Sequence, residues 1–178
     1  ALVGGNPVDP NATALIAPTV TTKLVEPQLV KANSPNDWVS QQDTITYTLS
    51  YMNETTETQP LALSDTAPAG TSLAPANAGS ALAGSPALTV GDTPVSNAAT
   101  SDATTGAVSW TCTVPPGKTV SATYEVVVGL AAQGEIRNTA SALIEDATTN
   151  THVPFDSNEV VNRVKPPLEK SVETAGAS

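Results

Sequence analysis

Two stretches of this chain alternate polar and apolar residues with a period of two, and this pattern constrains the fold more than any other feature. Between residues 44 and 51, Thr or Ser alternates with Ile, Tyr and Leu, and residues 119–128 repeat the pattern with Val, Ala and Tyr. Side chains two apart on a strand share a face. Each stretch therefore predicts a β-strand with one face in a core and the other in water. No segment has a convincing helical spacing of apolar residues.

Turn residues separate these stretches from further short strands. Pro115-Pro116-Gly117-Lys118 precedes the second alternating stretch, and Pro68-Ala69-Gly70 ends another strand. Residues 71–106 are rich in Ala, Ser, Gly and Thr, which predicts short edge strands, with a weak one at 87–90, and a long loop. The fold class that follows is all-β, an Ig-like antiparallel two-sheet β-sandwich of about seven to nine strands. The immunoglobulin Cys…Trp…Cys signature is absent, so the likeness is one of architecture.

Composition limits the core and the classes of partner. Of the 178 residues, 39% are hydrophobic and only 3% aromatic, so the core is built from small side chains and would gain from an additional fastening. The net charge of −10 disfavours nucleic-acid binding, because no basic surface is present to neutralise phosphates. The one cysteine, Cys112, excludes an internal disulfide and is expected to be a small buried side chain.

A short repeat indicates how the chain is organised. Val25–Ala32 and Val164–Ser171 share the pattern V-x-P-x-L-x-K followed by a small residue. The second copy starts where the strand pattern of the first unit ends, as expected for tandem domains. We therefore expect a leader or linker from a preceding unit at 1–22, an Ig-like repeat at 23–164, and a linker with the start of a following repeat at 165–178. No signal peptide or membrane span is recognisable.

Three polar residues lie on the apolar side of predicted strands. Lys31 follows Val25, Pro27 and Leu29 at steps of two, and Asp65 follows Leu61 and Leu63 in the same way. Asn138 belongs to the series of Ile136, Ala140, Ala142 and Ile144. A buried charge without a partner costs several kcal/mol, so we expect the three side chains to meet in the interior.

Five short motifs, in this order along the chain, resemble a known family of surface domains. They are Asp43–Leu49, Leu63–Gly70, Val108–Thr111, Pro116–Val120 and Ile136–Ser141. This set resembles the DUF11-type repeat of bacterial and archaeal surface proteins, and it is similar to the isopeptide-forming domains of Gram-positive pilins and adhesins. The resemblance covers residues 23–164. No sortase sorting signal or pilin polymerisation lysine motif is recognisable.

The resemblance implies a role for each of the three polar residues. In the isopeptide-forming relatives, a first-strand Lys joins a last-strand Asn, and an acid between them promotes the reaction. By motif position Lys31 and Asn138 match the cross-linked pair, and Asp65 matches the promoting acid. Burial favours a neutral amine and a neutral acid, so Lys31 can attack while Asp65 polarises the Asn138 carbonyl and passes a proton to ammonia.

Separate structural roles for the three residues remain open at this point. Asn138 could be satisfied by backbone groups, Asp65 could accept hydrogen bonds in the turn that leads to Gly70, and Lys31 could extend to the rim of the sandwich.

Other kinds of site find little support in the sequence. The acidic residues are scattered without a metal-binding spacing, and His152 stands alone, so we expect no metal, no cofactor and no enzyme beyond a single-turnover self-cross-link. Asn11 and Asn53 fit the glycosylation sequon. Trp110 lies on the apolar face of its predicted strand and is expected in the core. Trp38 lies near a turn and is expected over the end of the sandwich.

The function predicted from the sequence is a rigid spacer repeat of an extracellular surface or fibre protein, located at the cell surface or cell wall. Neighbouring repeats of the same protein or fibre are the expected partners, with a host surface protein or glycan also open. One alternative is an adhesive or carbohydrate-binding module that uses the 71–106 loop. Another is a filament subunit that exchanges terminal strands.

Overall fold

All regular structure in the described part of the chain is β-strand. The computed structural model describes residues 27–76, 80–146 and 151–166. Its strands are β1 (Leu29–Ser34), β2 (Trp38–Val39), β3 (Thr44–Met52), β4 (Gln59–Thr66), β5 (Thr71–Leu73), β6 (Ala87–Val90), β7 (Thr93–Pro94), β8 (Ala99–Asp102), β9 (Ala107–Val114), β10 (Thr119–Val128), β11 (Glu135–Asn138), β12 (Ser141–Asp146), β13 (Thr151–Asp156) and β14 (Val160–Val164).

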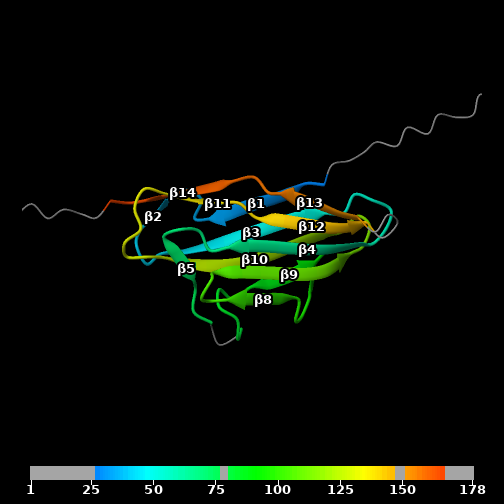
Figure 1. Cartoon of the computed structure of the whole chain (residues 1–178), viewed down its shortest axis with the longest axis horizontal. Helices are drawn as coiled ribbons and strands as arrows, with labels where there is room; N and C mark the ends of the chain where they lie inside the picture. Colours follow the sequence, from blue (N-terminus) through cyan, green and yellow to red (C-terminus); the bar gives the residue numbers. More distant parts are fainter. Residues whose placement is uncertain (1–26, 77–79, 147–150, 167–178) are drawn as a thin grey trace, which may run out of the picture.

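Two larger sheets stack into a sandwich, as the sequence predicted. One has the strand order β1-β3-β10-β6-β7, with β5 also paired to β10, and the other has the order β13-β12-β4-β9-β8. These two sheets overlap in the view of Figure 1, which looks down the shortest axis of the molecule. A smaller, separate sheet has the order β11-β14-β2, and only residues 139 and 140 separate β11 from β12 of the second sheet.

The core lies between the two layers and follows the alternation in the sequence. On β3 and β10 every second residue is buried, which confirms the two stretches of period two. Tyr47 and Tyr124 lie opposite each other on these neighbouring strands, and both are fully buried. Trp110 of β9 enters the core from the other layer, as its position on the apolar face of the strand predicted.

The segment 71–106 contains more regular structure than the expected long loop. The predicted strand at Ala87–Val90 is present as β6, and β5, β7 and β8 are short strands of two to four residues. β5, β6 and β7 extend the first sheet and β8 extends the second. These short edge strands account for much of the difference between the strands described above and the expected seven to nine.

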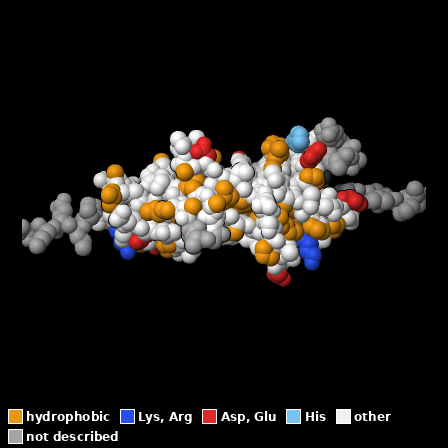
Figure 2. Space-filling view, turned by 90° about the horizontal axis from the view of Figure 1, so that it is seen from below, with side chains coloured by type: hydrophobic (Ala, Val, Ile, Leu, Met, Phe, Trp, Pro, Cys, Tyr) orange, Lys and Arg blue, Asp and Glu red, His pale blue; other side chains and the backbone are white. Residues whose placement is uncertain are grey.

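The two ends of the described chain lie toward opposite ends of the molecule. In Figure 1 the described chain begins, in blue, on one side of the sandwich and ends, in orange to red, on the opposite side. The face in Figure 2 shows mainly hydrophobic and uncharged polar atoms, with few charged side chains.

Within the described residues no helix is long and apolar enough to cross a membrane. The predicted leader at 1–22 and the strand expected near Leu168 fall outside the described residues, so these domain boundaries stay predictions.

Candidate functional site

A buried ion pair joins the two layers of the sandwich. Lys31 lies on β1 of the first sheet and Asp65 on β4 of the second, and the Lys31 Nζ contacts Asp65 Oδ2. Both side chains are completely shielded from solvent. Lys31 therefore does not extend to the rim of the sandwich, and two of the three predicted residues meet in the core. The Asp65 Oδ1 also accepts a hydrogen bond from the backbone amide of Thr66 at 2.8 Å.

The backbone of Lys31 is held on both sides. On one side it pairs with Leu49 of β3. On the other, the Asn158 side chain takes the place of a neighbouring strand, because its Oδ1 accepts from the Lys31 amide and its Nδ2 donates to the Lys31 carbonyl, both at 2.9 Å. These contacts fix the residue on β1 from which the amine enters the core.

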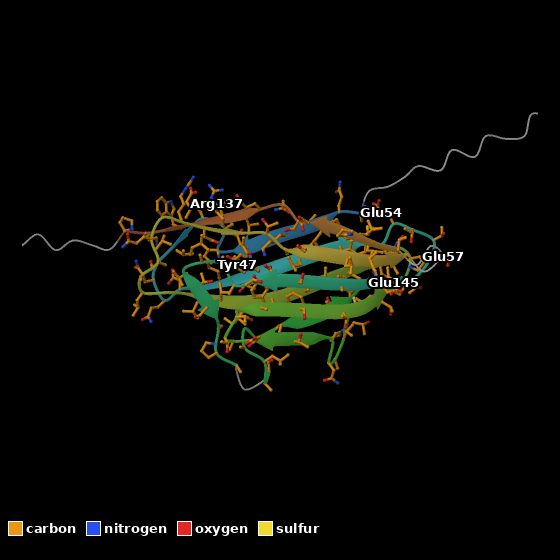
Figure 3. All side chains as sticks on the ribbon, viewed as in Figure 1. Tyr47, Glu54, Glu57, Arg137 and Glu145 are labelled. Atoms are coloured by element: carbon orange, nitrogen blue, oxygen red, sulfur yellow. The ribbon has the colours of Figure 1, made fainter. Side chains whose placement is uncertain are left out.

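Two tyrosine rings lie against the Lys31 amine, and a tryptophan ring packs against one of them. The Lys31 Nζ lies 4.7 Å from the centroid of the Tyr47 ring and 5.8 Å from that of Tyr124. Tyr124 packs between Tyr47 and Trp110, with centroid separations of 5.2 and 5.9 Å. In Figure 3 the labelled Tyr47 lies in the middle of the sandwich, whereas Arg137 and Glu57 lie at its periphery. The amine is therefore enclosed by rings and separated from water.

Burial moves the ion pair toward its neutral form. Desolvation lowers the pKa of Lys31 below its usual value, and the attraction of Asp65 opposes this shift. Desolvation likewise raises the pKa of Asp65, against the attraction of Lys31. Both directions favour transfer of the shared proton from nitrogen to oxygen, which leaves a nucleophilic amine beside a carboxylic acid.

The third predicted residue, Asn138, is buried at the end of β11 and is linked to the pair through Tyr124. Its Nδ2 donates a hydrogen bond of 2.8 Å to the Tyr124 hydroxyl. The same hydroxyl also interacts with the Asp65 carboxyl, and burial, followed by the charge of Asp65, raises the pKa of Tyr124 far above its usual range. The structure thus connects Lys31, Asp65, Tyr124 and Asn138 in that order. We expected Asp65 to contact Asn138 directly, and we find Tyr124 between them.

Several polar residues that support the site were missed in the sequence. Asn162 is fully buried on β14, where its Oδ1 accepts from Asn33 and its Nδ2 donates to the carbonyls of Pro35 and Asp37. It lies two residues from both Val160 and Val164, on the apolar face of its strand. The pattern that identified Asn138 therefore also identifies Asn162. No such pattern indicated the role of the Tyr124 hydroxyl, because a tyrosine on the apolar face of a strand is common in protein cores.

The structure also places the other candidates. Asn53 is fully buried, and its Nδ2 donates to the carbonyls of Glu57 and Val114, so this sequon nitrogen is not free for a glycan. Cys112 is only half-buried, in contrast to the buried side chain expected from the sequence, and burial raises its pKa to about 11. Trp38 is 48% exposed in β2. The described residues contain no group of three or more His, Cys, Asp or Glu side chains that could hold a metal ion.

Comparison with known proteins finds similarity at the level of the fold. No protein-family model matches the chain, and no curated protein matches it in sequence. The full-length major pilin SpaD from Corynebacterium diphtheriae superposes with a TM-score of 0.60 and 20% identity, over 76% of this chain and 34% of the pilin.

Two further pilins give the same result. The major pilin subunit BcpA of Bacillus cereus superposes with a TM-score of 0.59 and 15% identity, over 77% of this chain and 40% of the pilin. The pilus backbone RrgB from Streptococcus pneumoniae gives 0.51 and 15%, over 67% and 31%. The chain thus spans about a third to two fifths of the length of these pilins. Its fold is similar to that of domains of Gram-positive surface pilins.

Proposed function

We propose that this chain is a structural repeat of an extracellular surface or fibre protein, a rigid spacer fastened by an amide bond between Lys31 and Asn138. Asp65 promotes the bond, which forms once in each molecule with release of ammonia. The chain is therefore no turnover enzyme. Its partners are neighbouring repeats of the same protein or fibre, and the pilin-like fold supports a location at the cell surface.

The observation that carries this proposal is the fully enclosed Lys31–Asp65 pair, connected through Tyr124 to the amide of Asn138. A fold that needed only a stable core would gain as much from apolar side chains at these positions, because buried ion pairs contribute little net stability. The pair supplies a neutral nucleophile, a neutral acid and a nearby carboxamide in a dry site. Enforced proximity of this kind lowers a reaction barrier by several kcal/mol.

The arrangement of the chain supports a mechanical role for the bond. Lys31 lies in β1 at the start of the described chain, and Asn138 pairs with Val160 of β14 near its end. Because the two ends of the described chain lie toward opposite ends of the molecule, tension applied there would pass from β1 through the cross-link toward β14. The strands between Lys31 and Asn138 would be relieved of the force.

The alternative of an adhesive module that uses the 71–106 loop has less support. Most of the strands in this segment extend the two sheets, so it has less free loop than a recognition site of this kind would use. The strand-exchange alternative concerns termini that lie mostly outside the described residues, and it stays a prediction.

Intact mass of the denatured protein tests the proposal. We expect the wild-type chain to be lighter than its sequence mass by one ammonia, and Lys31→Ala and Asn138→Ala to have their full sequence masses. Lys118→Ala is the matched control, because this exposed lysine lies in a turn before β10 and its loss should leave the deficit intact. A wild-type mass equal to the sequence mass would end the cross-link proposal and leave the spacer fold standing.

A further inference from the structure

The Tyr124 hydroxyl occupies the position that a proton donor to the leaving group would need. Its oxygen is 2.8 Å from Asn138 Nδ2, the atom that departs as ammonia when the cross-link forms. The same oxygen interacts with the Asp65 carboxyl, which also contacts the Lys31 amine. Tyr124 thus lies between the acid and the leaving nitrogen.

The ring of Tyr124 is held so that the hydroxyl keeps this position. Tyr124 is fully buried, and its ring packs against Tyr47 on the neighbouring strand and Trp110 on the facing sheet. Its backbone is paired with Tyr47 of β3 in the middle of the first sheet. Preorganised contacts of this kind cost no rearrangement during a reaction.

On the basis of the proposed cross-link, we propose that Tyr124 is a catalytic residue of its formation, which relays a proton from Asp65 to the departing nitrogen of Asn138. The planar amide nitrogen donates to Tyr124 before the reaction. Once Lys31 has attacked, this nitrogen becomes tetrahedral and gains a free electron pair. The hydrogen bond then reverses, and the phenol becomes the donor.

The proton and electron balance closes without an external reagent. A proton first moves from the Lys31 ammonium to Asp65, and the amine then forms a bond to Asn138 Cγ as the carbonyl electron pair moves to Oδ1. Tyr124 gives its proton to Nδ2 and takes one from Asp65. The carbonyl re-forms, and the Cγ–Nδ2 bond breaks with its electron pair on ammonia. The Asp65 carboxylate then removes the excess proton from the new amide nitrogen, so Tyr124 is unchanged and Asp65 ends as the neutral acid.

The test compares two single hydroxyl deletions in the full chain. Freshly translated protein is denatured at successive times, and the fraction that has lost ammonia is measured by mass. Tyr124→Phe keeps the ring and removes the relay, and we expect the bond to form about 100-fold more slowly, as for the loss of a general acid. Tyr51→Phe is the matched control, because it also removes a buried phenol with a side-chain hydrogen bond, here to Gln59, and we expect it to match the wild-type rate.

A second measurement covers the case in which Tyr124→Phe does not fold. Full-length protein made with 3-fluorotyrosine has more acidic phenols of almost unchanged size, and we expect its bond to form faster than in the wild type. An unchanged rate in both Tyr124→Phe and the fluorinated chain would overturn the relay and leave the Lys31–Asn138 bond in place. A wild-type chain that never loses ammonia would instead overturn the cross-link, and the relay with it.

Discussion

At the residue scale, the core of this protein contains a charged pair that is a poor choice for stability alone. Lys31 and Asp65 are both fully shielded, and each shifts the other toward its charged form while burial shifts both toward neutrality. Because the folded pKa of Asp65 lies above its unfolded value of 3.8, stability falls as the pH rises from 3.8 through that folded pKa. Because the folded pKa of Lys31 lies below its unfolded value of 10.5, stability rises again as the pH rises from that folded pKa to 10.5, so before cross-linking the pair costs most stability between the two folded pKa values.

Removing only the lysine should widen the pH range over which stability falls as the pH rises. In Lys31→Met, Asp65 stays buried and loses its cation, so its folded pKa lies further above the unfolded value of 3.8. The folded state then binds more protons than the unfolded state in this window. Stability is therefore full below pH 3.8 and falls as the pH rises through the folded pKa, by at most about 1.4 kcal/mol per pH unit.

Urea unfolding of Lys31→Met between pH 3.5 and 8 checks this slope. The double variant Lys31→Met with Asp65→Asn is the control, because the amide cannot titrate and its stability should be nearly flat over the same range. A flat profile in the single variant would mean that Asp65 reaches water, and the site would not be dry.

At the element scale, the first and last described strands are connected through side-chain amides. Asn158 holds the edge of β1, and Asn162 of β14 is bonded to Asn33 of β1 and to the turn that follows it. β1 and β14 belong to different sheets, so the amides supply contacts that no backbone ladder provides. We infer that these amides hold Lys31 in the register in which its amine reaches Asp65.

Loss of the Asn162 amide should destabilise this connection. In Asn162→Ala the Pro35 and Asp37 carbonyls and the Asn33 amide each lose a hydrogen bond to a fully buried side chain, and we expect a loss of about 2–4 kcal/mol. Chemical denaturation measures it. Arg163→Ala on the same strand removes only exposed ion pairs with Asp37 and Glu135 and should change stability little. Equal effects of the two substitutions would contradict the role given to Asn162.

The strands and the buried polar residues could be predicted from the sequence because both follow from a period of two. A polar residue on the apolar face of a strand is an exception to this alternation. This exception identified Lys31, Asp65 and Asn138. Tyr124 and Asn158 could not be found in this way. The function of the Tyr124 hydroxyl depends on which residues of β4 and β11 lie beside it, and Asn158 is an exposed residue between strands whose partner is more than a hundred residues away.

At the scale of the whole molecule, the proposed bond would divide the chain into a tensioned path and a protected segment of roughly 100 residues. By analogy with a disulfide that closes a loop of this size, the bond would stabilise the fold by ~4–5 kcal/mol in the chain-entropy model. Such a fastening suits a small-residue core whose one cysteine is unpaired.

Stretching single molecules from their ends should reveal the protected segment. Asn138→Ala keeps the Lys31–Asp65 pair but cannot form the bond, so its unfolding should lengthen the chain by roughly 350 Å more than that of the wild type, at up to about 3.6 Å per residue. Arg163→Ala should lengthen as the wild type does. Equal lengthening of wild type and Asn138→Ala would place the segment in the path of the force.

A tryptic digest of the denatured wild-type protein tests the central claim most directly. Trypsin cleaves after Arg137, so Asn138 begins a peptide that ends at Arg163, while an acylated Lys31 resists cleavage within Leu24–Lys118. The account predicts one branched product that joins these two peptides through Lys31 and Asn138, with the mass of their sum less one ammonia. Two separate linear peptides at residues 24–31 and 138–163 would contradict it.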